Sequence, residues 1–121
     1  MTRRILVTAV LALDAALGSV SAQEVFKAGD GVTLPTPIRQ VKPGYTSAAM
    51  DARIEGKVGL DVVVLDDGKV GDVKVTQSLD MEYGLDTQAV EAAKQWLFKP
   101  GTKDGKAVAV RVAMEMTFTL K

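Results

Sequence analysis

The sequence predicts an α+β fold: a two-layer sandwich in which two helices pack on one face of a three-stranded antiparallel sheet. Seven apolar residues take every second position from Val108 to Leu120, which indicates a long strand with one buried face. A second alternating stretch is interrupted by a turn at Asp66–Lys69, which indicates a hairpin. Two segments with apolar residues at helical spacing flank this hairpin, so the predicted order is α-β-β-α-β.

The first 22 residues have the layout of a secretory signal peptide. Two arginines precede an apolar stretch over residues 5–13, and small residues follow up to Ala22. We therefore expect cleavage after Ala22 and export to the periplasm. Asp14, a carboxylate beside the apolar stretch, leaves open an alternative in which the segment is retained as an inner-membrane anchor, although a membrane span needs about 20 apolar residues.

Residues 23–42 form an extended lead-in with little periodicity, which can include a short edge strand. The domain proper is expected over residues 43–121. Its first helix is predicted over Tyr45–Gly56, with Thr46 or Ser47 as the N-cap and Gly56 at the end.

The hairpin is predicted over Lys57–Thr76, with a bulge near Gly71, and a loop follows it. Asp86 is the predicted N-cap of the second helix, and Pro100 stops the helical pattern. A turn is expected over Thr102–Lys106 before the last strand, which should exceed about 40 Å in length. Three aromatic residues are candidate core anchors: Trp96, Phe98 and Phe118.

The composition excludes several chemistries. The chain has no histidine and no cysteine, so it has neither a Ser-His-Asp nor a Cys-His relay and no Cys/His zinc site. Its neighbouring acids, Asp66–Asp67 and Asp80 with Glu82, fall in predicted loops, where solvated turn acids are the usual explanation. With 15 basic and 15 acidic residues there is no charge excess that would favour nucleic acid. We therefore expect no catalysis, no metal and no cofactor.

Several short motifs follow one another in a fixed order between Val41 and Leu120. They are Pro-Gly-Tyr, Arg-Ile-Glu-Gly, an Asp-Gly-Lys hairpin turn, Trp-x-Phe-x-Pro and a second Asp-Gly-Lys turn (43–45, 53–56, 67–69, 96–100 and 104–106). In this order they resemble the C-terminal domain of TonB, the energy transducer of Gram-negative envelopes. The resemblance implies a two-helix, three-stranded domain in which the last strand pairs with a segment of an outer-membrane transporter.

A long edge strand can support such pairing, because its free N–H and C=O groups accept an added strand. We therefore expect a periplasmic peptide-binding domain whose partner is a TonB-dependent outer-membrane transporter or another envelope protein. Tyr45 can equally be a core residue. The predicted partner-binding residues are Lys42, Pro43 and Tyr45 beside the first helix, with Arg111, Ala113, Glu115 and Thr117 on the last strand.

Three features depart from the family pattern. Thr46 replaces a proline after Tyr45, and Lys42 stands where the best-known members have a glutamine. The lead-in is also much shorter than a transducer's proline-rich spacer. Two alternatives therefore stay open: a short membrane-anchored transducer, and a self-associating envelope module that forms a homodimer through the last strand.

Overall fold

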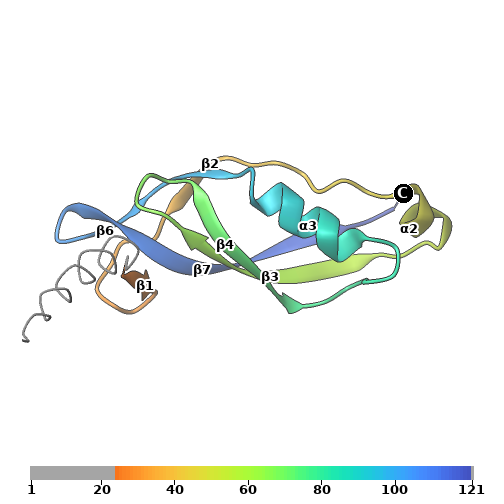
Figure 1. The fold of residues 1–121 in the computed structure, drawn as a ribbon, viewed down its shortest axis with the longest axis horizontal. Coiled ribbons are helices and arrows are strands. Elements are labelled where there is room, and N and C mark those ends of the chain that lie inside the picture. Colours follow the sequence, from red (N-terminus) through yellow and green to blue (C-terminus); the bar gives the residue numbers. More distant parts are fainter. Residues whose placement is uncertain (1–23, 121) are drawn as a thin grey trace, which may run out of the picture.

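The structure is a computed structural model that describes residues 24–120, so the predicted signal peptide over residues 1–22 lies outside the described residues. The domain is elongated, and its strands run along the long axis (Figure 1). No helix in residues 24–120 has the length and apolar character that crossing a bilayer requires. The elements are β1 (Val25–Lys27), β2 (Thr36–Arg39), α2 (Ser47–Asp51), β3 (Gly56–Val64), β4 (Val70–Gln77), α3 (Leu85–Ala93), β5 (Leu97–Lys99), β6 (Gly101–Lys103) and β7 (Lys106–Phe118).

The main sheet has five strands, and β7 is central to it. The path through the sheet is β1-β7-β3-β4, and β6 pairs with the beginning of β7. β3 pairs antiparallel with β7 from Gly56–Phe118 to Val64–Val110, and β1 pairs parallel with β7 at Ala109–Arg111. The prediction of three strands is therefore wrong, because short segments of three residues add to the long ones.

The alternation that predicts β7 is confirmed by burial. Residues at even positions from Val110 to Phe118 are buried or half-buried, whereas the odd positions from Arg111 to Thr117 are exposed. The predicted hairpin is also confirmed, since β3 and β4 pair antiparallel and the register shifts between Val62 and Val64, opposite Gly71. β7 is the longest strand, with 13 residues against nine in β3 and eight in β4.

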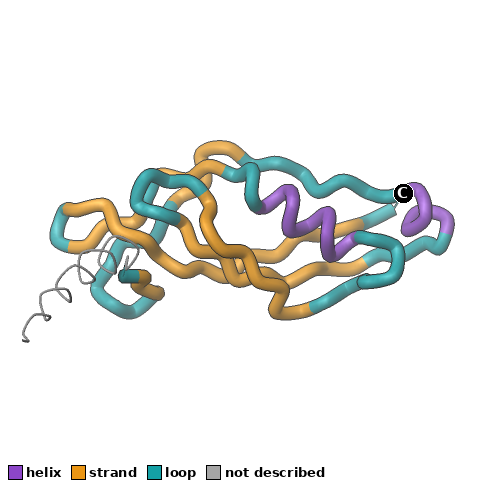
Figure 2. Tube along the Cα trace, in the orientation of Figure 1, coloured by secondary structure: helices purple, strands orange, loops and turns teal. Residues whose placement is uncertain are grey.

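The second layer contains both helical and extended chain. α3 lies across the sheet, whereas α2 sits at one end of it (Figures 1 and 2). A separate two-stranded sheet of β2 and β5 extends this layer beyond α3. Over residues 24–120 the fold is mixed α+β with two helices, as predicted. The core lies between the layers, and its largest fully buried side chains are Leu60, Leu85, Val58, Val62, Val64 and Val110.

The three predicted aromatic anchors all contribute to this core. Phe118 and Phe98 are buried, and Trp96 packs against the cluster with its ring stacked on Phe98 at a centroid distance of 5.9 Å. The Trp96 indole N–H also donates to the Val41 carbonyl at 2.9 Å. The aromatic residues therefore hold the lead-in to the helical layer as well as filling the core.

Four local predictions need correction. α2 stops at Asp51, before Gly56, because Arg53 adopts a left-handed conformation with φ of 57°. α3 begins at Leu85, so Asp86 lies inside its first turn and Gly84 is the N-cap. The stretch predicted as a turn at 102–106 includes strand β6, which pairs with β7 across a tight turn at Asp104 and Gly105. The lead-in holds two short strands, β1 and β2.

The start of α2 agrees with prediction. The Thr46 side chain accepts a hydrogen bond from the Ala49 N–H at 3.1 Å, which satisfies one of the free donors at the helix N-terminus. The Thr46 hydroxyl also donates to the Tyr83 carbonyl at 2.8 Å, which ties α2 to the loop before α3. Thr46 thus holds the first helix and the loop before α3 together at this end of the domain.

Candidate functional site

The second half of β7 has an open main-chain edge. Val110 and Arg111 pair with β3 on one side and with β1 on the other, so β1 and β3 flank β7 on opposite sides. β1 ends at Lys27, opposite Arg111. Within the described residues no strand pairs with the β1 side of β7 from Val112 to Phe118. The predicted edge strand is therefore an edge only over these seven residues, since β6 and β1 pair with the beginning of β7.

An edge of this length can accept another strand. Seven residues span about 23 Å in extended conformation, and neighbouring strands lie about 4.8 Å apart. Their N–H and C=O groups on the open side have no strand partner among residues 24–120. Such an edge is a template for an extended chain of almost any sequence, because the bonds involve main-chain groups.

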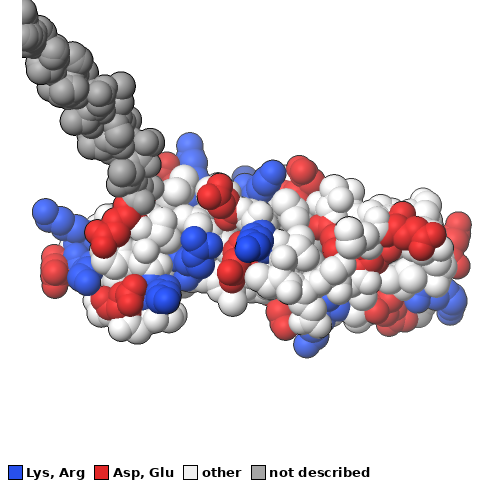
Figure 3. Space-filling model, turned by 60° about the horizontal axis from the view of Figure 1, so that its bottom comes forward, with Lys and Arg blue, Asp and Glu red and all other residues white. Residues whose placement is uncertain are grey.

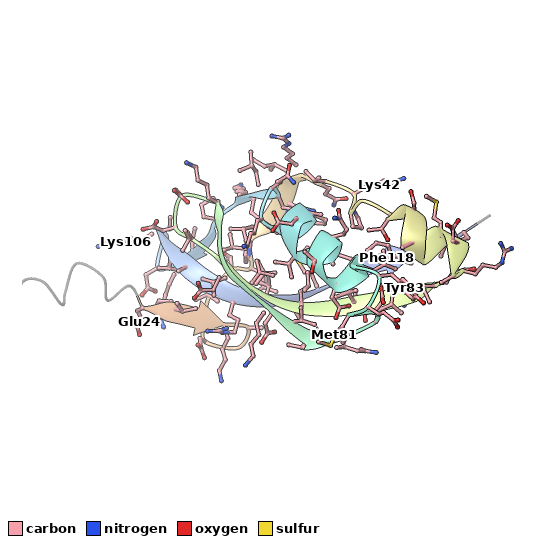
Figure 4. The ribbon with its side chains drawn as sticks, turned by 45° about the vertical axis from the view of Figure 1, so that its right-hand side comes forward. Glu24, Lys42, Met81, Tyr83, Lys106 and Phe118 are labelled. Atoms are coloured by element: carbon pink, nitrogen blue, oxygen red, sulfur yellow. The ribbon has the colours of Figure 1, made fainter. Side chains whose placement is uncertain are left out.

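A hollow of about 190 Å³ lies at the Phe118 end of this edge. It is lined by Lys42, Pro43, Tyr45 and residues 117–119. Figure 4 shows Lys42 and Phe118 at the α2 end of the domain, far from Glu24 and Lys106. The structure thus brings the three predicted residues near the first helix together with the end of β7, and the exposed ammonium of Lys42 gives this end a positive group.

Tyr45 has a structural role in this hollow. Its hydroxyl donates to the Ile54 carbonyl, and its ring meets Phe118 edge-on with a centroid distance of 5.4 Å. Burial, together with the nearby Glu55 carboxylate, raises the pKa of Tyr45 above its ordinary value, so the phenol is neutral and acts as a donor. The sequence leaves open whether Tyr45 is a core residue or a partner-binding residue. These contacts are those of a core residue, although Tyr45 also lines the hollow.

A second hollow, of about 270 Å³, lies beside the beginning of the open edge. Residues from three parts of the chain line it: Leu34, Pro35 and Pro37 in the lead-in, Trp96 and Phe98 around β5, and Val112, Ala113 and Met114 on β7. Sequence reasoning missed the lead-in residues as site residues. The available signal was weak, because two prolines and isolated apolar residues in an aperiodic stretch indicate only extended chain.

The four predicted residues on β7 lie on the exposed face of the sheet. The side chains of Arg111, Ala113, Glu115 and Thr117 are all exposed. Glu115 faces Lys57 of β3 at 3.6 Å, in an ion pair whose members are both more than half exposed. Exposed pairs of this kind stabilise a fold by at most about 1 kcal/mol. Arg111 differs from the other three because its backbone already lies beside β1.

One acid of each neighbouring pair that the sequence singled out has a structural partner. Asp80 accepts hydrogen bonds from the backbone N–H groups of Glu82, Tyr83 and Leu85 at 2.9–3.1 Å. Asp80 thereby accepts a hydrogen bond from the N–H of the first residue of α3, whereas the sequence predicts that Asp86 caps this helix. Asp67 likewise accepts from the Lys69 N–H within the hairpin turn. These bonds explain Asp80 and Asp67 as loop-forming residues.

Asp86 is also part of this loop. It accepts from the Ser78 hydroxyl at 2.5 Å and from the N–H groups of Leu79 and Asp80 at 2.9 and 3.0 Å. Burial by itself raises the pKa of Asp86, but the three hydrogen bonds outweigh it and leave the pKa below its ordinary value. The carboxylate lines a larger hollow of about 610 Å³ between β4 and α3. No group of three or more acidic residues in the stretch 24–120 is arranged to hold a metal ion.

Charges of both signs occur together on one face of the domain. On the face that Figure 3 displays, lysine and arginine alternate with aspartate and glutamate. This distribution matches the equal numbers of basic and acidic residues in the sequence. Among the described residues, this face therefore has no large field of a single sign that would attract a strongly charged partner (Figure 3).

Comparison with known proteins identifies a single family. The family model described as the C-terminal domain of the Gram-negative bacterial TonB protein matches residues 41–120. Protein TonB of Xanthomonas campestris pv. campestris (strain B100) is 37% identical over 78 residues, which cover 64% of this chain and 34% of that protein. Protein TonB of Pseudomonas aeruginosa is 33% identical over 82 residues, covering 68% of this chain and 23% of that protein.

A further relative and a solved structure agree. Protein TonB of Vibrio cholerae is 35% identical over 82 residues, which cover 68% of this chain and 33% of that protein. The solution NMR structure of the Pseudomonas aeruginosa TonB CTD superposes with a TM-score of 0.60 at 25% identity, covering 82% of this chain and 97% of that one. The chain thus spans between about a quarter and a third of the length of its full-length relatives, but almost all of the solved domain.

Proposed function

The chain belongs to the family of TonB C-terminal domains, and from this premise we propose that it binds an extended segment of an outer-membrane transporter. The segment adds as a strand along the open edge of β7 at Val112–Phe118. A different envelope protein that offers an extended segment is the alternative partner. The role is that of a binding module in energy transduction for transport across the outer membrane, and it involves no catalysis.

The observation that carries this proposal is the open edge itself. In the part of the chain that the structure describes, seven consecutive residues of β7 have a strand on one side only, and hollows adjoin both ends of this stretch. Each end combines the edge with chain from outside β7, so an added strand would contact more than backbone. Lys42 at the Phe118 end favours a partner with an acidic side chain there.

The exposed face next to the edge completes the proposed site. Ala113, Glu115 and Thr117 would lie beside side chains of the added strand that point to the same face, where cross-strand pairs contribute about 0.2–1 kcal/mol each. Arg111 stands at the boundary with β1 and can contact only the end of the segment. Pro43 and Tyr45 shape the hollow around Lys42 rather than recognise charge.

Proline substitution tests the proposal. Successive N–H groups of a strand point alternately to its two neighbours, so one of the variants Ala113→Pro and Met114→Pro removes a donor from the open side and the other removes one that faces β3. The variant that keeps a cooperative unfolding transition is the informative one. Ala113→Ser and Met114→Ala are its matched controls, since they change the side chain and leave the N–H in place.

Binding is measured by titrating the labelled domain with synthetic peptides that cover the periplasm-facing segments of outer-membrane transporters. We expect backbone amide shifts over residues 112–118 and a loss of affinity of at least tenfold in the folded proline variant. Unchanged affinity in that variant, or shifts confined to other surfaces, would contradict the proposal.

A homodimer through the same edge is the competing occupant. Light scattering of the protein over a range of concentrations separates the two cases. If two copies pair through β7, Ala113→Pro or Met114→Pro will convert a dimer to a monomer, and the peptide will compete with dimer formation. A monomer that binds peptide supports the transporter segment as the occupant.

A further inference from the structure

The lead-in is fastened to the domain although most of it lies before the region that the family model matches. Thr33 and Thr102 exchange backbone hydrogen bonds at 2.8 and 3.3 Å, and their hydroxyls lie 2.6 Å apart. β2 continues this attachment by pairing antiparallel with β5. Gly101 permits the close approach, since a Cβ there would lie 2.5 Å from the Thr33 carbonyl oxygen. The segment between Thr33 and β2 therefore has a defined position.

This position gives the 270 Å³ hollow one of its walls. Leu34, Pro35 and Pro37 line the hollow together with Val112–Met114, and Trp96 and Phe98 contribute aromatic surface to it. The lining is almost wholly apolar, and Leu34 is 52% exposed. This apolar surface is still partly exposed to water. A ligand side chain that covers it therefore gains hydrophobic free energy from the apolar area it removes from water.

We propose that the lead-in makes the domain selective for an extended peptide with a large apolar side chain, such as Leu or Phe, at the position that faces Val112–Met114. This inference rests on the proposed function, because it takes the open edge of β7 as the place where the peptide binds. The family-matched part of the chain, from residue 41 onward, supplies the edge, and residues 34–37 supply the selectivity.

Strand geometry and volume support this occupant. Alternate side chains of an added strand point to the same face as Val112 and Met114, which is the face where the hollow lies. An apolar cavity of about 150 Å³ can hold benzene, so a hollow of about 270 Å³ has room for a leucine or phenylalanine side chain. A glycine or serine at that position would leave the hollow unfilled. We expect a preference of about tenfold for Leu over Gly, because the hollow is open to solvent and buries the side chain only in part.

The test combines a substituted peptide with two variants of the lead-in. Each position of a peptide that binds the β7 edge is replaced in turn by Gly, Ala, Leu and Phe, and affinity is measured by calorimetry. Leu34→Ala removes part of the wall. Ile38→Ala is the matched control, since Ile38 lies in the same segment, is 69% exposed and does not line the hollow.

We expect one peptide position at which Leu or Phe binds about tenfold more tightly than Gly. This preference should fall below about threefold in Leu34→Ala and stay unchanged in Ile38→Ala. If peptides bind the edge with no such position, or with a preference that Leu34→Ala leaves intact, the selectivity is refuted while the proposed function stands. If no peptide binds, or if light scattering shows a dimer that excludes peptide, both are refuted.

Discussion

The Asp86 carboxylate should contribute strongly to the stability of the loop before α3. We predict that Asp86→Ala lowers the free energy of unfolding by about 2–4 kcal/mol at pH 7. The substitution removes the acceptor of two backbone donors, the N–H groups of Leu79 and Asp80, and of the Ser78 hydroxyl. A buried donor left without a partner costs about 1–3 kcal/mol. The wild type pays a cost for removing the charged carboxylate from water, and the alanine variant does not. This difference offsets part of the destabilisation caused by the unpaired donors.

Urea denaturation followed by Trp96 fluorescence measures this effect. Glu91→Ala is the control, because Glu91 is an exposed acid on the same helix and its loss should change stability by no more than about 0.5 kcal/mol. The loss in free energy of unfolding for Asp86→Asn should lie between those of Asp86→Ala and Glu91→Ala, because the amide oxygen still accepts hydrogen bonds but carries no charge. A loss in Asp86→Ala no larger than that in Glu91→Ala would refute the reasoning.

The pH dependence gives a second test of the same residue. The pKa of Asp86 in the folded protein lies below its ordinary value, which an unfolded chain shows at about 3.9. The ionised carboxylate therefore stabilises the fold above the unfolded pKa, and this contribution is lost as the pH falls through the folded pKa. The stability gap between the wild type and Asp86→Asn should narrow from pH 7 to pH 3. A gap that stays constant or widens would show that the charge has no part in it.

Two further substitutions test the packing around β5. Gly68→Ala should destabilise the domain by at least about 2 kcal/mol more than its control, Gly105→Ala. Both glycines have positive φ, but a Cβ at Gly68 would collide with the Phe98 carbonyl, whereas the space around Gly105 is open. Equal losses of stability in thermal unfolding would contradict this prediction. Trp96→Phe should lower the melting temperature by about 4–8 °C, because it leaves the Val41 carbonyl without its indole donor at a cost of about 1 kcal/mol; an unchanged melting temperature would refute the role of that bond.

The long elements of the fold could be predicted from the sequence because their signals are local. β7 alternates over its full length, and the β3–β4 hairpin has alternation on both arms with a glycine at its turn. The short strands could not be predicted in the same way. β1, β5 and β6 have three residues each, too few to show a period, and they form because their partners lie nearby in space.

The same distinction applies to the candidate site. The exposed face of β7, with Ala113, Glu115 and Thr117, follows from the alternation alone. Lys42 is a predicted site residue only through the family resemblance, and its position beside the end of β7 is known only from the structure. The wall formed by residues 34–37 depends on pairing between Thr33 and Thr102, which are 69 positions apart, and no local pattern in the sequence encodes that distance.

The position of β7 has a consequence for the order of folding. The last of the described strands lies inside the sheet, between β3 and the earliest described strand, β1. Until residues 106–118 are available, β1 has no partner and one edge of β3 is open. The chain therefore cannot complete its sheet from the N-terminus onward, and its rate-limiting step should close the long loop between β1 and β7. A chain truncated before β7 would expose two unpaired edges, the condition under which nascent β proteins aggregate.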